Sequence, residues 1–165
     1  MRNAEAGFSL MEVMIATAIL AILLAIAVPN YVGWLPGHRL RTAAADIRST
    51  HQLVKSRAIR HNRQCAILFN PGAGIYQAID GGPDGTYGTG DDNVVKTVNV
   101  NAYGSGVTLF NVTYGGNAVV FQPTGLNQAM GFAFVNNVLG DQCRVGTNSL
   151  AGVVVYHSFI GGSWQ

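Results

Sequence analysis

Glu12 is a carboxylate inside an apolar segment, and its position predicts chemistry more clearly than any other in the sequence. It lies within the apolar run from Phe8 to Val28. An ionised carboxylate in hydrocarbon is costly unless it is paired, so such a residue is by default a candidate functional site. If the chain is cut between Gly7 and Phe8, Phe8 carries a new α-amino group. Glu12 of one subunit could then pair with that amine on a neighbouring subunit during lateral assembly.

A second candidate site is the glycine-rich segment 80–91, whose spacing overlays a calcium-binding loop. Asp80, Asp84 and Asp91 fall at loop positions 1, 5 and 12, and Gly85 falls at position 6, where the sharp turn needs glycine. The carbonyl of Thr86 would be the ligand at position 7. Position 3 is a glycine without a ligand, and position 12 is the shorter Asp rather than Glu. A surface loop with solvated carboxylates is therefore the alternative to a Ca²⁺ site.

Cys65 and Cys143 are the two cysteines of the chain, and two arrangements are open for them. A disulfide would require an oxidising compartment. It would close a loop of nearly 80 residues and contribute about 4 kcal/mol by chain entropy. The alternative is two independent buried thiols at strand positions.

Basic residues dominate the segment 38–63, where Asp46 is the one carboxylate. Their side chains either form a solvated helix face or contact acidic groups, such as DNA phosphates or the surfaces of other subunits. Aromatic residues do not alternate with them, so the nucleic-acid signal is weak. The candidates for DNA contact are Arg48, Lys55, Arg57, Arg60 and Arg63.

The sequence carries no motif that indicates catalysis. It has no Gly-x-Ser-x-Gly, no His-Glu-x-x-His and no phosphate-binding glycine loop. His38, His51 and His61 do not recur at metal-ligand spacing. We therefore expect no enzymatic activity, and no cofactor other than calcium in the loop 80–91.

The apolar run itself predicts a membrane-spanning helix. Hydrophobic residues make up 48% of the 165-residue chain and charged residues 11%, which excludes a disordered protein. The run from Phe8 to Val28 has about 21 residues, and it would be about 32 Å long as a helix, close to the thickness of the hydrocarbon core. Arg2 places the N-terminus in the cytoplasm and the remainder across the membrane. The small residues at 27–30 leave a cleaved secretory signal as the alternative.

Beyond this run we expect an amphipathic helix and then a β-rich head. Pro29, Gly33, Pro36 and Gly37 should interrupt the helix. Helical periodicity returns between residues 38 and 61. The stripe that should pack on the head comprises Leu40, Ala44, Ile47, His51, Val54 and Ala58.

Short β-like runs between Gly, Asn and Asp turns fill the rest of the chain and predict an antiparallel sandwich. The fold class is α+β. The expected strands are 64–69, 75–80, 94–101, 107–112, 118–122, 132–136, 142–145 and 152–159.

The segment Gly7-Phe8-Ser9-Leu10-Met11-Glu12-Val13 resembles the class III signal of type IV pilins and type II secretion pseudopilins. The resemblance implies cleavage between Gly7 and Phe8 by a prepilin peptidase, which also N-methylates Phe8. It implies that the apolar helix remains as both membrane anchor and filament core, and that Glu12 serves assembly. Pro29 stands where many pilins carry a kinking proline.

Two further segments are similar to the GspH/FimT branch of the pseudopilins. They are Ser56-Arg57-Ala58-Ile59-Arg60 before a strand, and Val120-Phe121-Gln122-Pro123-Thr124-Gly125. The resemblance implies a pilin fold with the stem helix packed under two β-sheets. Some DNA-uptake members end in a basic Gly-Arg-x-Arg segment, whereas this chain ends in Gly-Gly-Ser-Trp-Gln, which puts DNA binding in doubt.

We therefore expect a minor pilin or pseudopilin that primes or caps a type IV pilus. The alternatives are a pseudopilin of a type II secretion system and a DNA-binding minor pilin of a transformation pilus. The expected partners are prepilin peptidase, other pilins and the inner-membrane assembly machinery. The predicted segments are a leader at 1–7, a single-pass inner-membrane helix at 8–29, a periplasmic stem at 30–63 and a head at 64–165.

Overall fold

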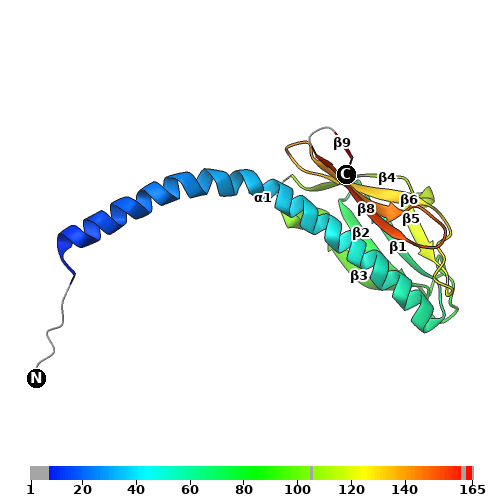
Figure 1. Cartoon of the computed structure of the whole chain (residues 1–165). Coiled ribbons are helices and arrows are strands. Elements are labelled where there is room, and N and C mark those ends of the chain that lie inside the picture. The colour runs from blue at the N-terminus through cyan, green and yellow to red at the C-terminus, as the bar shows by residue number, and fades with distance from the viewer. Residues whose placement is uncertain (1–7, 105, 161–162, 165) are drawn as a thin grey trace, which may run out of the picture. The chain divides into compact units, whose positions relative to one another are not determined.

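The computed structural model describes residues 8–104, 106–160 and 163–164. The chain forms two compact units, residues 1–35 and residues 36–165. One helix, α1 (Leu10–His61), contributes to both units (Figure 1).

The first unit is described from residue 8 onward, and this described part, mainly the N-terminal half of α1, forms no core of its own. All residues from 8 to 34 are exposed, including Phe8 at 82% and Ile26 at 68%. The helix is long and apolar enough to cross a membrane, with a mean hydropathy of 2.6 over its most apolar window. In water this surface would be strongly unfavourable, so the unit requires a bilayer or other helices around it.

The expected interruption of the helix at residues 29–37 is wrong. The helix of Leu10–His61 runs through Pro29, Gly33, Pro36 and Gly37 without a break. A proline removes one backbone donor and crowds one carbonyl, while the hydrogen bonds of the neighbouring residues remain. Good helix formers on both sides, mainly Ala, Ile and Leu, favour continuation over a stop at these positions.

In the second unit, residues 36–61 of α1 form what we call the stem, which packs on two sheets. Leu40, Ile47 and Val54 are almost fully buried. Their spacing of seven residues places them on one face of the helix. The six residues of the predicted stripe are all buried, together with Ala43 and Thr50, so the amphipathic stem is confirmed.

Two antiparallel sheets complete the second unit (Figure 1). The four-stranded sheet has the order β3-β2-β1-β5, and the five-stranded sheet has the order β4-β6-β7-β8-β9. Short 3₁₀ turns, η1 (Val100–Tyr103) and η2 (Gly115–Asn117), connect strands. The strands are β1 (Cys65–Asn70), β2 (Ile75–Asp80), β3 (Asn93–Asn99), β4 (Thr108–Val112), β5 (Ala118–Phe121), β6 (Gly131–Asn136), β7 (Gln142–Thr147), β8 (Val154–Ile160) and β9 (Ser163–Trp164). The expected α+β arrangement of an apolar helix and two antiparallel sheets is confirmed.

The core lies between the stem and the inner faces of both sheets. Phe69, Tyr76 and Phe121 are its largest aromatic side chains, and each is at most 2% exposed. Phe69 stacks on Tyr114 at 6.0 Å between ring centroids. One core therefore joins the stem and both sheets of the second unit.

Candidate functional site

Ser9 and Glu12 form the start of α1. The backbone N–H of Glu12 donates to Oγ of Ser9 at 3.2 Å. This is half of a capping box, in which a serine is followed three residues later by a glutamate, and the negative charge also favours the helix N-terminus. Sequence reasoning missed Ser9, although the Ser-x-x-Glu spacing was a signal for it.

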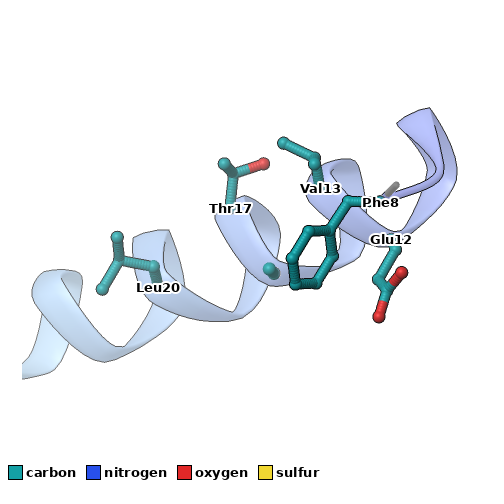
Figure 2. A pocket seen from close by; sticks show the side chains of 6 residues that line it. Phe8, Glu12, Val13, Thr17 and Leu20 are labelled. Carbon is teal, nitrogen blue, oxygen red and sulfur yellow. The ribbon is translucent and has the colours of Figure 1, made fainter. Parts of the chain in front are cut away.

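The carboxylate of Glu12 lies on an open helix surface. Shallow grooves flank it on both sides, and the first is lined by Phe8, Glu12, Val13, Ala16, Thr17 and Leu20. Figure 2 shows Phe8 and Glu12 side by side at the beginning of the helix. Among the described residues, the Glu12 carboxylate accepts no hydrogen bond and forms no ion pair. A lone carboxylate on an apolar helix needs a partner, and the described residues do not supply one.

Gly7 lies outside the described residues, so the structure does not describe the peptide bond between Gly7 and Phe8 at which cleavage is predicted. Phe8 is described and its side chain is exposed. Cleavage and N-methylation at this position stay predictions.

The basic residues of the stem are not one free surface. Nε of Arg57 donates to Oδ2 of Asp80 at 2.9 Å, and Nη1 of Arg63 lies 4.0 Å from Oδ1 of the same carboxylate. Nζ of Lys55 donates to the carbonyls of Ala151 and Gly152 at 3.0 and 3.1 Å. Arg57 and Lys55 thus fasten the stem to β2 and to the loop before β8, and Arg63, two residues beyond the stem, also lies near Asp80 of β2.

Arg48 and Arg60 remain exposed. They are two of the five residues predicted to contact DNA, and neither forms a hydrogen bond or ion pair among the described contacts. Sequence reasoning could not find the internal roles of Lys55 and Arg57, because their partners lie 23 to 97 residues away along the chain.

The structure does not bring the three aspartates predicted to bind calcium together as a ligand set. Asp80 is 4% exposed and faces Arg57, as described above. Asp84 and Asp91 hold the loop: Oδ1 of Asp84 accepts from the N–H of Thr86 at 2.8 Å, and Oδ2 of Asp91 accepts from the N–H of Asp84 at 3.1 Å. No group of three His, Cys, Asp or Glu that could hold a metal occurs within the described ranges. Calcium binding stays a prediction.

The loop also needs glycine where a calcium loop usually carries a ligand. Gly82 has a φ of +59°, and a Cβ there would collide with the backbone oxygen of Asp91. The hydrogen bond from the Thr89 hydroxyl, followed by that from the Asp84 N–H, holds the pKa of Asp91 below its usual value. The carboxylates of this loop therefore have a structural use without any metal.

Asp46, the one carboxylate of the stem, accepts hydrogen bonds from three sequence-distant side chains, a role that sequence reasoning did not predict. It accepts from the hydroxyls of Tyr76 and Tyr103 at 2.6 and 2.7 Å and from Nζ of Lys96 at 2.8 Å. Burial opposes its ionisation, but the hydrogen bonds from Lys96, Tyr76 and Tyr103 outweigh burial and lower its pKa. Burial and the bond to Asp46 raise the pKa of both tyrosines. The cluster ties the stem to β2, β3 and η1.

His51 is fully buried between Phe69, Tyr114 and Phe121. Its Nδ1 lies 2.9 Å from the carbonyl oxygen of Ile47. Burial lowers the pKa of His51 to about 4, despite the opposing effect of that hydrogen bond. A neutral histidine in this place is part of the core rather than a ligand or a base.

Cys65 and Cys143 are both buried and free in the structure, and the disulfide between them stays a prediction. Cys65 lies in β1 of one sheet and Cys143 in β7 of the other. Sγ of Cys143 lies 3.3 Å from the hydroxyl of Tyr156. Burial raises the pKa of Cys65 to about 11 and raises that of Cys143, which leaves both thiols protonated and unreactive.

Two family models match the chain. One, described as the prokaryotic N-terminal methylation motif, matches residues 2–28. The other, described as type II transport protein GspH, matches residues 43–152, which is more than half of the chain. No curated protein and no solved structure gives a match. The first match contains Gly7, Phe8 and Glu12, and the second contains most of the stem and strands β1 to β7.

Proposed function

Since the chain belongs to the family of the type II transport protein GspH, we propose that it primes or caps a type IV pilus. Together with the N-terminal methylation motif, this family makes the chain a minor pilin or pseudopilin. Subunits of this class are processed by a prepilin peptidase and assemble with other pilins. The proposal concerns which filament this one enters and what it does there.

The observation that supports assembly most directly is the exposed apolar surface of residues 8–34, with Glu12 as its single carboxylate. A bilayer covers this surface before assembly, and helices of neighbouring subunits would cover it in the filament. The orientation we propose is a single pass through the inner membrane with the head in the periplasm. Arg2, before the helix, is consistent with a cytoplasmic N-terminus.

Glu12 would supply the axial register of the filament. Apolar packing between helices is not directional, so it allows one helix to slide along another. Cleavage after Gly7 creates one amine, on Phe8, and each helix carries one carboxylate that can pair with it. Removal of one partner of a buried ion pair costs about 3–5 kcal/mol, which is enough to select one axial position.

The test of the pilus role is the quantity of sheared surface pili in a deletion strain and in the complemented strain. We expect pili to disappear on deletion and to return on complementation with the wild-type chain. Unchanged pili in the deletion strain would exclude a priming role.

A second candidate is a pseudopilin of a type II secretion system, and the description of the matching family favours it. In that case the deletion strain keeps its pili but retains its secreted proteins in the periplasm. Measuring both phenotypes in one strain separates the two filaments.

DNA uptake has weaker support, because Lys55, Arg57 and Arg63 have partners inside the molecule. Arg48 and Arg60 are the remaining predicted DNA contacts. A salt-dependent shift of DNA by residues 36–165, lost in the Arg48→Gln, Arg60→Gln double variant, would support this role.

A further inference from the structure

The outer face of the five-stranded sheet carries aromatic side chains from four strands around one arginine. The burial pattern of β6 alternates, so Ala133 and Val135 face the core while Phe132 and Phe134 face away from it. Cross-strand pairs extend this face, since Phe134 lies opposite Arg144 and Arg144 lies opposite His157. We call this the aromatic face, and it comprises Phe110, Phe132, Phe134, Arg144, His157, Phe159 and Trp164.

The rings of the aromatic face pack at steep angles to one another instead of stacking in parallel. The centroid of Phe134 is 5.9 Å from that of Phe110 and 6.2 Å from that of Trp164. Five ring pairs on this face meet at interplanar angles between 53° and 75°. Phe110 and Trp164 are the most open, at 43% and 39% exposure.

Arg144 lies in the middle of these rings. Its Cζ is 5.0 Å from the ring centre of Phe132 and 4.4 Å from that of Trp164. Rings therefore cover the guanidinium, and its Nε is buried without a hydrogen-bond partner among the described residues. Described carboxylates form no ion pair with it. Such a donor is costly to leave unsatisfied, and a carboxylate is the group that fits its fork of N–H groups.

The composition of this face matches the centre of a protein–protein interface. Interface centres are enriched in Trp, Phe and Arg and depleted in Lys, Asp and Glu. The other outward positions of β4, β6 and β7 include Thr108, Asn136 and Gln142, and none of these is charged. A contiguous, partly exposed apolar patch with polar residues around it is typical of an interaction site.

We propose that the aromatic face is the docking surface for another protein subunit, which presents a carboxylate to Arg144 from an apolar surround. This inference rests on the proposed function, because a filament subunit must contact neighbours through its head as well as its helix. Charge complementarity selects the occupant. A second copy docked through the same face would place Arg144 against Arg144, which is repulsive. Tilted, half-buried rings offer few open faces on which nucleic-acid bases could stack.

The first experiment measures incorporation of full-length variants into sheared filaments. We expect Arg144→Glu to lower incorporation about tenfold or more, because loss of an arginine at the centre of an interface commonly removes a large share of the binding free energy. Arg60→Glu is the matched control, because it makes the same charge reversal at an exposed stem position. Wild-type incorporation of Arg144→Glu would overturn the inference.

Glu12→Val separates failure of this inference from failure of the proposed function. If Glu12→Val is excluded from filaments and Arg144→Glu enters normally, the docking surface alone is wrong. If both variants enter normally, the register role of Glu12 is wrong as well, whereas absence of the wild-type chain from sheared filaments would exclude the assembly role itself. Thermal unfolding of each variant shows whether the head has kept its fold.

The second experiment uses a photo-crosslinking benzoylphenylalanine at position 110 in cells that assemble filaments. We expect an adduct with a different protein, through a peptide that contains Asp or Glu, and loss of the adduct in Arg144→Glu. The control position is Val94, which is 49% exposed on β3 of the other sheet. An adduct that survives Arg144→Glu, or one with twice the mass of this chain, would contradict the proposal.

The third experiment tests nucleic acid as the competing occupant. Trp34 and Trp164 are the two tryptophans of the chain, so Trp34→Phe leaves Trp164 as a fluorescent reporter within the face. We expect oligothymidylate to leave the emission of this variant in detergent unchanged. Quenching that requires Arg144 would instead assign the face to single-stranded nucleic acid.

Discussion

The carboxylates of the two units are used in opposite ways. Glu12, in the first unit, has no internal partner among the described residues, whereas Asp46 and Asp80, in the second, are paired with Lys96 and Arg57. The surrounding surface differs in the same sense, because residues 8–34 are all exposed while the stem buries one complete stripe. The comparison teaches that the first unit depends on other molecules to cover its apolar surface and to pair its carboxylate, whereas the second unit supplies the partners of Asp46 and Asp80 from its own strands. Each prediction below changes one side of this comparison.

The largest effect is expected at the processing position. Gly7→Glu should abolish cleavage, because a prepilin peptidase of this class cuts after glycine and a bulky charged residue would not fit. Immunoblotting should show only the precursor. A band of mature size in this variant would remove the cleavage hypothesis.

Glu12→Val should leave membrane insertion intact but reduce incorporation into filaments by more than about a hundredfold, from the 3–5 kcal/mol cost of a lost ion-pair partner. The melting temperature of the head should not change, because Glu12 touches no residue of the second unit in any described contact. Membrane fractionation measures the insertion of this variant, and immunoblots of sheared filaments measure its incorporation. Normal incorporation would refute the register role.

Acid should destabilise the head through His51. Its pKa is lowered to about 4 in the folded state, so the unfolded state binds more protons between about pH 6.5 and 4. Stability should therefore fall as the pH drops through this range, by about 3 kcal/mol in total. Denaturant unfolding of residues 36–165 at several pH values measures this loss of stability. His51→Gln should remove most of this slope, while the contribution of Asp46, whose pKa is lowered, is lost only at still lower pH.

Asp46→Asn should destabilise the head by about 2–3 kcal/mol, because it weakens three hydrogen bonds to a charged acceptor. Asp84→Asn is the control, since that residue is exposed and the amide oxygen can still accept from Thr86. Urea unfolding compares the two variants. Equal stability would show that the Asp46 cluster contributes specificity rather than stability.

The smallest effect is expected for Lys55→Met. It removes two hydrogen bonds to the loop before β8 but keeps the apolar part of the side chain, so we expect a loss of about 1 kcal/mol. Arg60→Met, at an exposed position without a described partner, should be neutral. A larger effect in Arg60→Met than in Lys55→Met would contradict the separation of the basic stem into fastening and free residues.

Local patterns in the sequence predicted the elements well. The apolar run, the stem stripe and most strands depend on periodicity, which a short stretch of chain contains in full. The interruption at 29–37 was wrong because proline and glycine are only local penalties, which flanking helix formers can outweigh. The calcium spacing is also a local pattern and stays a prediction, and the sequence could not show that Asp80 pairs with Arg57.

By itself, the sequence determined the membrane-type helix, the lone Glu12 and the α+β class, because each of these follows from neighbouring residues. Only the tertiary structure decided which charges are free. Asp46, Lys55 and Arg57 each find partners from strands and loops more than 20 residues away, and such pairings depend on how the sheets meet the stem. The aromatic face arose in the same way, since its rings come from four strands that lie apart in the chain and meet only through the register of one sheet.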